Sequence, residues 1–189
     1  MALEWLRLQP DAFDGVVTVN TGLKGICKGK ERAQPKAKWR MVGIVLTLNR
    51  AKREEKILAI NGNYHDGDTT ILRKWMDIQE RHPLSNFTMV RQTLANELHR
   101  PQAHPLGVPT LTVGSRADDI VANACHCAVS DALDSELVLH DKSGHGMPID
   151  EPEWLAEQVS LWWKRHHPEY VPVLQPAQPG NQAAELMRK

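Results

Sequence analysis

The chain has 189 residues, 41% of them hydrophobic and 24% charged, as in an ordinary soluble globular protein of one domain. The 23 lysines and arginines balance the 23 aspartates and glutamates, so no global field draws nucleic acid or an anionic membrane. No apolar run is long enough to span a membrane, and the first residues lack the pattern of a signal peptide. We therefore expect a cytoplasmic protein with neither nucleic acid nor membrane as a partner. Three cysteines, an odd number with two of them one residue apart, predict no disulfide framework.

The first half of the chain predicts one strand and then a long helical segment. Met1 to Gln9 has the apolar spacing of a short amphipathic helix, which Pro10 ends. The run from Val16 to Asn20 (VVTVN) is typical of a buried strand. Helical patterns separated by turns then continue from Thr21 to about His99. The stretch from Gly25 to Lys38 is basic, which indicates either a solvated surface or an anion-binding patch.

The second half of the chain predicts a βαβ unit. The strands Thr110 to Gly114 and Glu136 to His140 are separated by a helical segment, so they should be parallel. Asp118 follows the first of these strands, and His145 follows the second within a Gly-His-Gly turn. Functional groups collect beyond the carboxyl ends of such strands, so we expect Asp118 and His145 at the same edge of the sheet.

The last part of the chain predicts one more helix and then a tail. The helix should run from Asp150 to His167, with an apolar face that includes Trp154 and Trp162. The residues from 171 to 189 are rich in proline and glutamine, and we expect them to be extended or disordered.

These motifs resemble the C-terminal half of an α/β-hydrolase. The turn Gly114-Ser115-Arg116-x-Asp118-x-x-Val121 is similar to the one that carries the family's catalytic acid, and Gly144-His145 is similar to the one that carries its histidine. The resemblance implies a truncated α/β-hydrolase-like fold over residues 1–170, with a short parallel sheet of about three strands and a helical lid at approximately 22–100. The family's nucleophile elbow, Gly-x-Ser-x-Gly, does not occur in this sequence.

The resemblance implies a hydrolase acting on small ester- or lactone-type molecules through Asp118 and His145. A carboxylate that accepts one imidazole N–H leaves the other ring nitrogen basic, which is the logic of a catalytic triad. The nucleophile would then be water or Cys27, because Gly25-Ile26-Cys27-Lys28-Gly29 matches the elbow form with cysteine and flanking lysines could lower its thiol pKa. An ordinary loop or core cysteine is the alternative.

Two other functions remain open at the level of sequence. Asp118, His126 and His145 could bind a divalent metal such as zinc, which would activate water for hydrolysis of an ester or phosphotriester. His65, beside Asp66 and Asp68, is a further candidate ligand, although the spacing fits no standard zinc signature. Alternatively, the chain is a non-catalytic remnant or a fragment of a longer enzyme, and it serves as a binding or interaction module.

The strand from Val16 to Asn20 predicts how the chain associates. In the family this strand is hydrogen-bonded on both sides, whereas here one neighbour is missing. Because soluble proteins normally cover such an edge, we expect a homodimer formed either through the exposed sheet edge or by exchange of lid helices.

Overall fold

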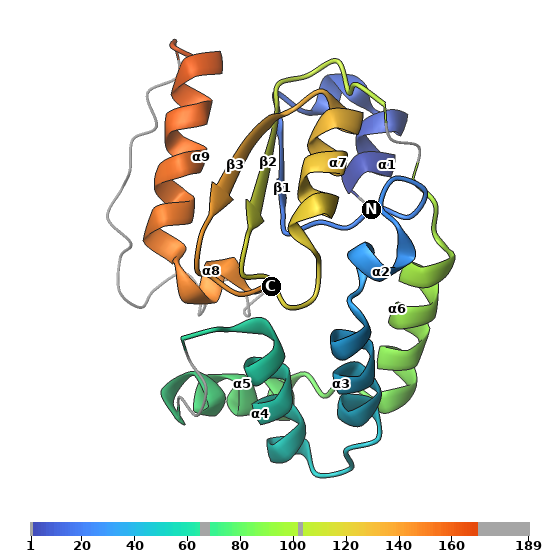
Figure 1. The fold of residues 1–189 in the computed structure, drawn as a ribbon. Coiled ribbons are helices and arrows are strands. Elements are labelled where there is room, and N and C mark those ends of the chain that lie inside the picture. The colour runs from blue at the N-terminus through green and yellow to red at the C-terminus, as the bar shows by residue number, and fades with distance from the viewer. Residues whose placement is uncertain (1, 65–68, 102–103, 170–189) are drawn as a thin grey trace, which may run out of the picture.

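A computed structural model describes residues 2–64, 69–101 and 104–169 of the chain. The histidine and aspartates at 65, 66 and 68, and the tail from 171 to 189, lie outside the described residues. The described part is an α/β structure in which a small sheet lies between helices (Figure 1). The predicted fold class is therefore confirmed.

The sheet contains three parallel strands in the order in which they occur in the chain. They are β1 (Val16–Val19), β2 (Thr110–Ser115) and β3 (Glu136–His140). Thr112 lies beside Thr18 on one side and Leu137 on the other, so β2 is the central strand. All three strands were predicted within one residue at each end, because β-branched and leucine-rich runs of this length are characteristic of buried parallel strands.

Helices surround the sheet and fill the segment between β1 and β2. They are α1 (Ala2–Leu8), α2 (Gly29–Arg32), α3 (Pro35–Val45), α4 (Arg50–Asn61), α5 (Thr69–Arg81), α6 (Asn86–Leu98), α7 (Asn123–Leu133), α8 (Met147–Asp150) and α9 (Pro152–His166), together with the short 3-10 helix η1 (Pro10–Ala12). The last predicted helix begins two residues later than expected, as α9 at Pro152. The separate short helix α8 precedes it, and Pro152 lacks the N–H that would continue α8. None of the described helices combines the length and the apolar character that a membrane crossing requires.

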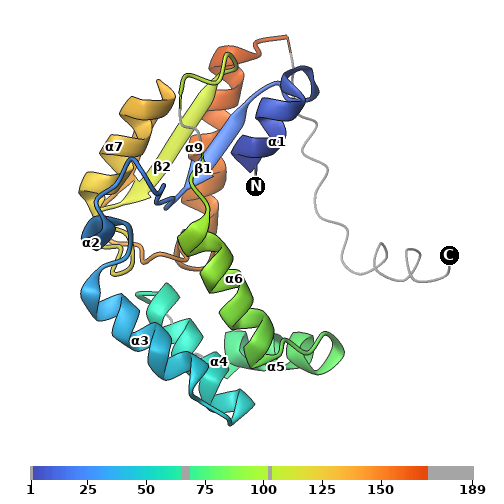
Figure 2. The same ribbon diagram turned by 90° about the vertical axis from the view of Figure 1, so that its right-hand side faces the viewer.

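The two faces of the sheet pack against different helices. Figures 1 and 2 show α9 on one face and α1 with α7 on the other. On the α9 face, Leu111 and Val113 pack with the fully buried Trp162. On the α7 face β1 and β2 carry threonines, and the hydroxyl of Thr18 donates to that of Thr112. The helices α3, α4 and α5 lie beyond the carboxyl ends of the strands, where Asp118 and His145 were expected.

Candidate active site

Asp118 lies in the turn that follows β2, and both of its carboxylate oxygens accept hydrogen bonds from neighbouring donors. Oδ1 accepts the backbone N–H groups of Ile120, at 2.7 Å, and of Val121, at 2.9 Å. Oδ2 lies 2.9 Å from Nδ1 of His145. The side chain is wholly buried, so these three donors replace the water that an exposed carboxylate would bind.

His145 lies after β3, and its ring is held so that one nitrogen remains available. An ionised carboxylate only accepts hydrogen bonds, so Nδ1 carries the proton that it donates to Asp118. Nε2 is then the basic nitrogen. The side chain is 28% exposed, which gives this nitrogen access to the surrounding cavities.

The backbone of the histidine turn is fixed from several directions. The side-chain amide of Asn20, at the end of β1, donates to the carbonyl oxygens of Gly144, at 3.1 Å, and His145, at 2.8 Å. Asp150 accepts from the N–H of Gly144, and the carbonyl oxygen of Asn61, in α4, accepts from Gly146 at 2.7 Å. A Cβ at Gly144 would lie 2.5 Å from that same carbonyl oxygen, so a glycine is required there.

The sequence alone does not reveal the positioning roles of Asn20 and Asp150. Asn20 has a φ of 47°, a left-handed conformation that asparagine adopts more readily than most residues. An asparagine directly after a predicted strand was the signal that could have found it. From the sequence, Asp150 marks only the start of a helix. Its partner Asn63 is distant in sequence, and its partner Gly144 lies in a turn whose shape the sequence does not give.

Asp119 does not compete with Asp118 for the histidine. Its half-exposed carboxylate pairs with Lys36 at 3.2 Å and with Arg40 at 3.6 Å, both in α3. Because adjacent residues in this turn point in different directions, only Asp118 reaches His145.

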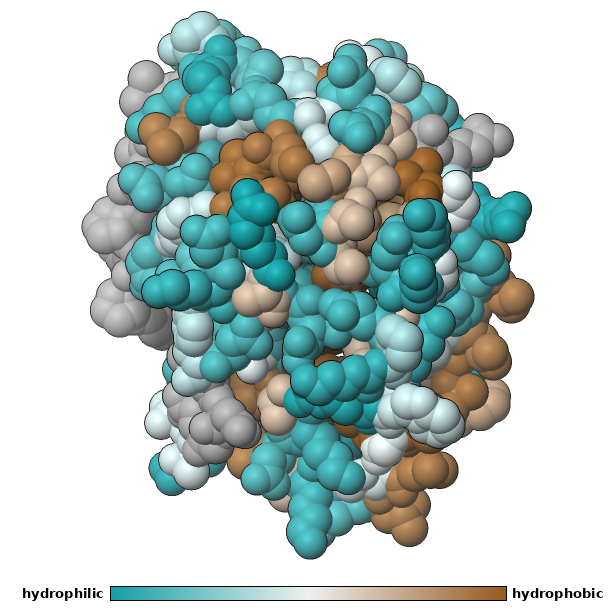
Figure 3. Space-filling model, in the orientation of Figure 1, coloured by the Kyte–Doolittle hydropathy of each residue, from teal (hydrophilic) through white to brown (hydrophobic). Residues whose placement is uncertain are grey.

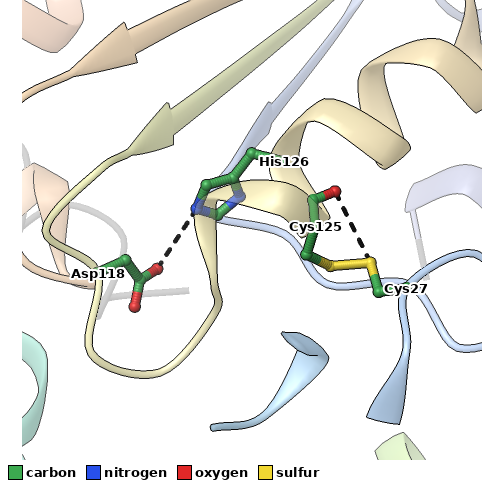
Figure 4. The surroundings of a disulfide bond; sticks show 4 residues. All are labelled: Cys27, Asp118, Cys125 and His126. Atoms are coloured by element: carbon green, nitrogen blue, oxygen red, sulfur yellow. Dashed lines mark hydrogen bonds and ion pairs between the residues drawn. A yellow bond between two sulfur atoms is a disulfide. The ribbon is translucent and has the colours of Figure 1, made fainter. Parts of the chain in front are cut away.

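His126, in α7, lies behind Asp118 and is completely buried. Its Nε2 is 3.8 Å from Oδ2 of Asp118, and neither ring nitrogen has a hydrogen-bond partner (Figure 4). Burial lowers the pKa of His126 below its ordinary value of 6.5, and the nearby Asp118 opposes that shift only in part. The imidazole is therefore neutral at neutral pH.

Asp118, His126 and His145, the three residues proposed as metal ligands, lie close together but are not arranged to bind a metal ion. Asp118 lies between His126 and His145, but its two oxygens are engaged by backbone N–H groups and by a proton on His145. Among the described residues, no group of three or more histidine, cysteine, aspartate or glutamate side chains is arranged to hold a metal ion. The geometry is that of a hydrogen-bonded pair.

Cys27 differs from its predicted role, because it forms a disulfide with Cys125 (Figure 4). The expectation that the cysteines form no disulfide is therefore wrong. It relied on the odd number and on the closeness of Cys125 and Cys127, whereas the bond joins residues 98 positions apart. In this oxidised state Cys27 has no thiol with which to attack a substrate, and Cys127 is the free cysteine.

Two cavities meet at His145. One, of about 410 Å³, has walls that combine apolar side chains with polar ones, among them Asn20, Arg32 and Asn96. The other, of about 230 Å³, is lined mainly by apolar side chains of α3, α4 and α6, among them Ile44, Ile57 and Met89. A small molecule with one polar and one apolar part could therefore bind with its centre beside the imidazole.

The walls of these two cavities contain threonine hydroxyls but no serine. The hydroxyl of Thr21 donates to the carbonyl oxygen of Val19 at 3.2 Å, and that of Thr93 donates to the carbonyl oxygen of Met89 at 2.9 Å. Both hydroxyls are thus oriented toward their own backbone. Water is the attacking group that this part of the chain leaves available.

Two further cavities lie away from His145. A groove of about 810 Å³ runs between α1 and α6 and is lined by Trp5, Leu8 and Ala95, among others. A smaller cavity, of about 230 Å³, lies between α3 and α4 beside Arg40 and Lys56. Neither contains Asp118 or His145.

Comparison with known proteins supports the fold through structure alone. No protein-family model matches the chain, and no curated protein sequence is significantly similar to it. Solved structures do match: an esterase from Thermogutta terrifontis (TM-score 0.57, 17% identity), the esterase RhEst1 from Rhodococcus sp. ECU1013 (0.65, 13%) and a meta-cleavage product hydrolase from Pseudomonas fluorescens IP01 (0.65, 14%).

These matches cover most of this chain but only part of the others. They include 88%, 85% and 87% of this chain, which spans 61%, 60% and 60% of the three proteins in the same order. The chain therefore has the structure of part of the α/β-hydrolase fold.

Proposed function

We propose that this chain hydrolyses small ester- or lactone-type molecules, with His145 as the general base and Asp118 as the residue that orients it. The observation that carries this proposal is the carboxylate of Asp118, which is held by two backbone N–H groups on one oxygen and faces Nδ1 of His145 with the other. Structural similarity to esterases and other hydrolases supports the same class of reaction.

The proposed chemical step uses water as the nucleophile. Nε2 of His145 takes a proton from a water molecule as its oxygen attacks the ester carbonyl, and the resulting imidazolium is stabilised by Asp118. The imidazolium then returns the proton to the leaving alcohol, so that the acid and the alcohol are released and the histidine is again neutral.

We also propose that residues 22–100 act as a lid that selects the substrate. Ile44, Ile57 and Met89 come from three different helices of this segment, and all three line the apolar cavity beside His145. That cavity would take a short apolar group of the substrate. The larger cavity, whose walls include Asn20, Arg32 and Asn96, would take the remainder of the molecule.

The alternative functions make different predictions. A metal-dependent hydrolase would need ligands beyond the Asp118–His145 pair, because these two side chains are engaged with each other. A non-catalytic binding module would keep its fold and its ligand after loss of His145 and would show no turnover at any stage.

The test is hydrolysis of a panel of activated esters and lactones by the purified protein and its variants, with and without a chelator. His145→Ala should lower kcat by about 100-fold or more, because a positioned general base contributes factors of that size. His82→Ala is the matched control, since His82 is exposed and far along the chain from the pair, and it should leave kcat unchanged.

Asp118→Asn is the second variant in this test. An amide in place of the carboxylate favours the wrong tautomer of His145, so kcat should fall by about 10³-fold or more. Asp119→Asn is its control, because that carboxylate pairs with Lys36 and Arg40 instead. Equal turnover in wild type and His145→Ala, with both folded by circular dichroism, would refute the proposed role of the pair.

A further inference from the structure

The helix α3 presents an apolar stripe to solvent. Trp39 and Leu46 are 77% and 72% exposed, and Val42 between them is about half exposed. The spacing of three and then four residues places these side chains on one face of the helix. Leu48, in the following turn, is 88% exposed. A surface helix normally buries its apolar face, so a second apolar face in contact with water indicates a binding surface.

The opposite face of α3 is already used by the core. Ala37 and Ile44 are buried there, and Ile44 belongs to the cluster that includes Cys125 and Val129. Figure 3 shows hydrophobic side chains along the lower right edge of the molecule, over α3 and α6. The exposed stripe is therefore additional to the core-facing side of the helix.

Unpaired positive charges surround this stripe. From Lys24 to Lys56 the chain has eleven lysines and arginines and only three glutamates, although the whole chain is formally neutral. Lys38, Arg50 and Lys52 are exposed and lie one to four residues from the stripe or from Leu48. Across the described ranges none of these three forms an ion pair, and Lys38 donates only to the carbonyl oxygen of Gly29, at 3.4 Å. The neutral net charge thus conceals a basic surface.

The charge and the shape of the surface around this stripe distinguish between the partners that could bind it. In a symmetric contact between two copies of this stripe, Lys38, Arg50 and Lys52 would meet their own equivalents, and like charges oppose such pairing. A bound peptide helix would need a groove, but the stripe side chains line none of the four cavities described above. A protruding surface with tryptophan, leucine and surrounding lysines fits the boundary of a lipid layer.

We propose that the α3 face, defined by Trp39, Val42, Leu46 and Leu48 with Lys38, Arg50 and Lys52, docks on an anionic lipid surface. The apolar side chains insert at the level of the headgroups, and the three cations bind the negative headgroups. The protein lies on the surface. This inference goes beyond the hydrolytic proposal and does not depend on it, because docking requires neither His145 nor turnover.

The test is flotation of the full chain with vesicles of phosphatidylcholine alone and of phosphatidylcholine with 30% phosphatidylglycerol. The wild type should float with the anionic vesicles, and added salt should weaken that binding because it screens the headgroup charge. Lys38→Glu with Lys52→Glu should weaken binding by about 30-fold or more, given the contribution expected of two basic residues near such a surface.

Matched variants test whether binding depends on the α3 face or only on the total charge of the protein. Lys142→Glu with Lys164→Glu makes the same charge change at two exposed lysines outside α3 and α4, and it should leave binding nearly unchanged. Trp39→Ser with Leu46→Ser alters only exposed side chains, so it should fold normally and lose binding to anionic vesicles.

Three outcomes would overturn the proposal. The first is a wild type that floats with neither kind of vesicle. The second is equal binding to neutral and anionic vesicles, or equal loss in both lysine pairs. The third is a wild-type dimer that Trp39→Ser with Leu46→Ser converts to a monomer, which would assign the face to a second copy of the chain.

Discussion

Gly114 and His126 occupy the same small space behind Asp118. A Cβ on Gly114 would lie 2.6 Å from Cγ of the imidazole, a distance that real Cβ atoms do not adopt. His126 is completely buried and cannot move toward solvent. The glycine at the end of β2 is therefore required by a particular side chain of α7, and the pair together supports the position of Asp118.

Gly114→Ala should therefore lower the free energy of unfolding by about 1–3 kcal/mol, the usual cost of overpacking a core. In a His126→Ala background the same substitution should cost under about 1 kcal/mol, because the ring is gone. Gly43→Ala, in α3, is the control. Apart from neighbouring residues of its own helix, no atom lies within 4 Å of the added Cβ, so this substitution should leave the free energy of unfolding unchanged or raise it. Urea unfolding of the wild type and the four variants measures these costs, and an equal cost of Gly114→Ala in both backgrounds would contradict this contact.

At the scale of elements, the disulfide joins two parts of the chain that border the candidate active site. Cys27 lies between β1 and α2, and Cys125 lies in the first turn of α7, directly before His126. The loop that the bond closes contains all of α3 to α6. Such a bond limits the freedom of the unfolded chain and should hold the base of this helical segment against α7.

Replacement of both cysteines by serine should lower the free energy of unfolding by about 2–5 kcal/mol. Because the disulfide leaves no thiolate at position 27, the double variant should keep its hydrolytic activity, whereas a cysteine nucleophile would be lost with it. Titration of thiols in the unreduced, denatured wild type should find one, from Cys127. Three thiols would contradict the bond and would agree with the reducing cytoplasm that the sequence led us to expect.

At the scale of the whole molecule, β1 is an outer strand of the described sheet. Its ladder is formed with β2, and the N–H groups of Val16 and Asn20 donate to Pro109 and Val113 on that side. Since N–H groups alternate along a parallel strand, that of Val17 points away from β2. We propose that two chains pair through the edge of β1 that faces away from β2 in the described sheet, which is one of the two arrangements that the sequence suggests.

Light scattering after gel filtration should give a mass about twice the 21.3 kDa of one chain. Val17→Pro removes the outward N–H at an edge position that tolerates proline, and it should produce a folded monomer. Thr18→Pro is the contrasting variant, because it removes an N–H on the side of β2 and should unfold the sheet. A dimer that persists in Val17→Pro would favour exchange of lid helices, and a monomeric wild type would refute the dimer.

The sequence by itself determined the strands, most of the helices and the pairing of Asp118 with His145. Apolar periodicity is a local property, and parallel strands in a βαβ unit bring their carboxyl ends to one edge, so both results follow from residues close along the chain. The start of the last helix at Pro152, and the separate short helix before it, did not follow from this periodicity.

Only the tertiary structure decided the features that join distant residues. These include the disulfide across 98 residues, the bonds from Asn20 to the histidine turn, the close packing of Gly114 with His126 and the solvent-facing stripe of α3. Which side of an amphipathic helix meets the core, and which cysteines meet each other, depends on how elements pack in space. No local pattern contains that information, and so no reading of the chain in order could supply it.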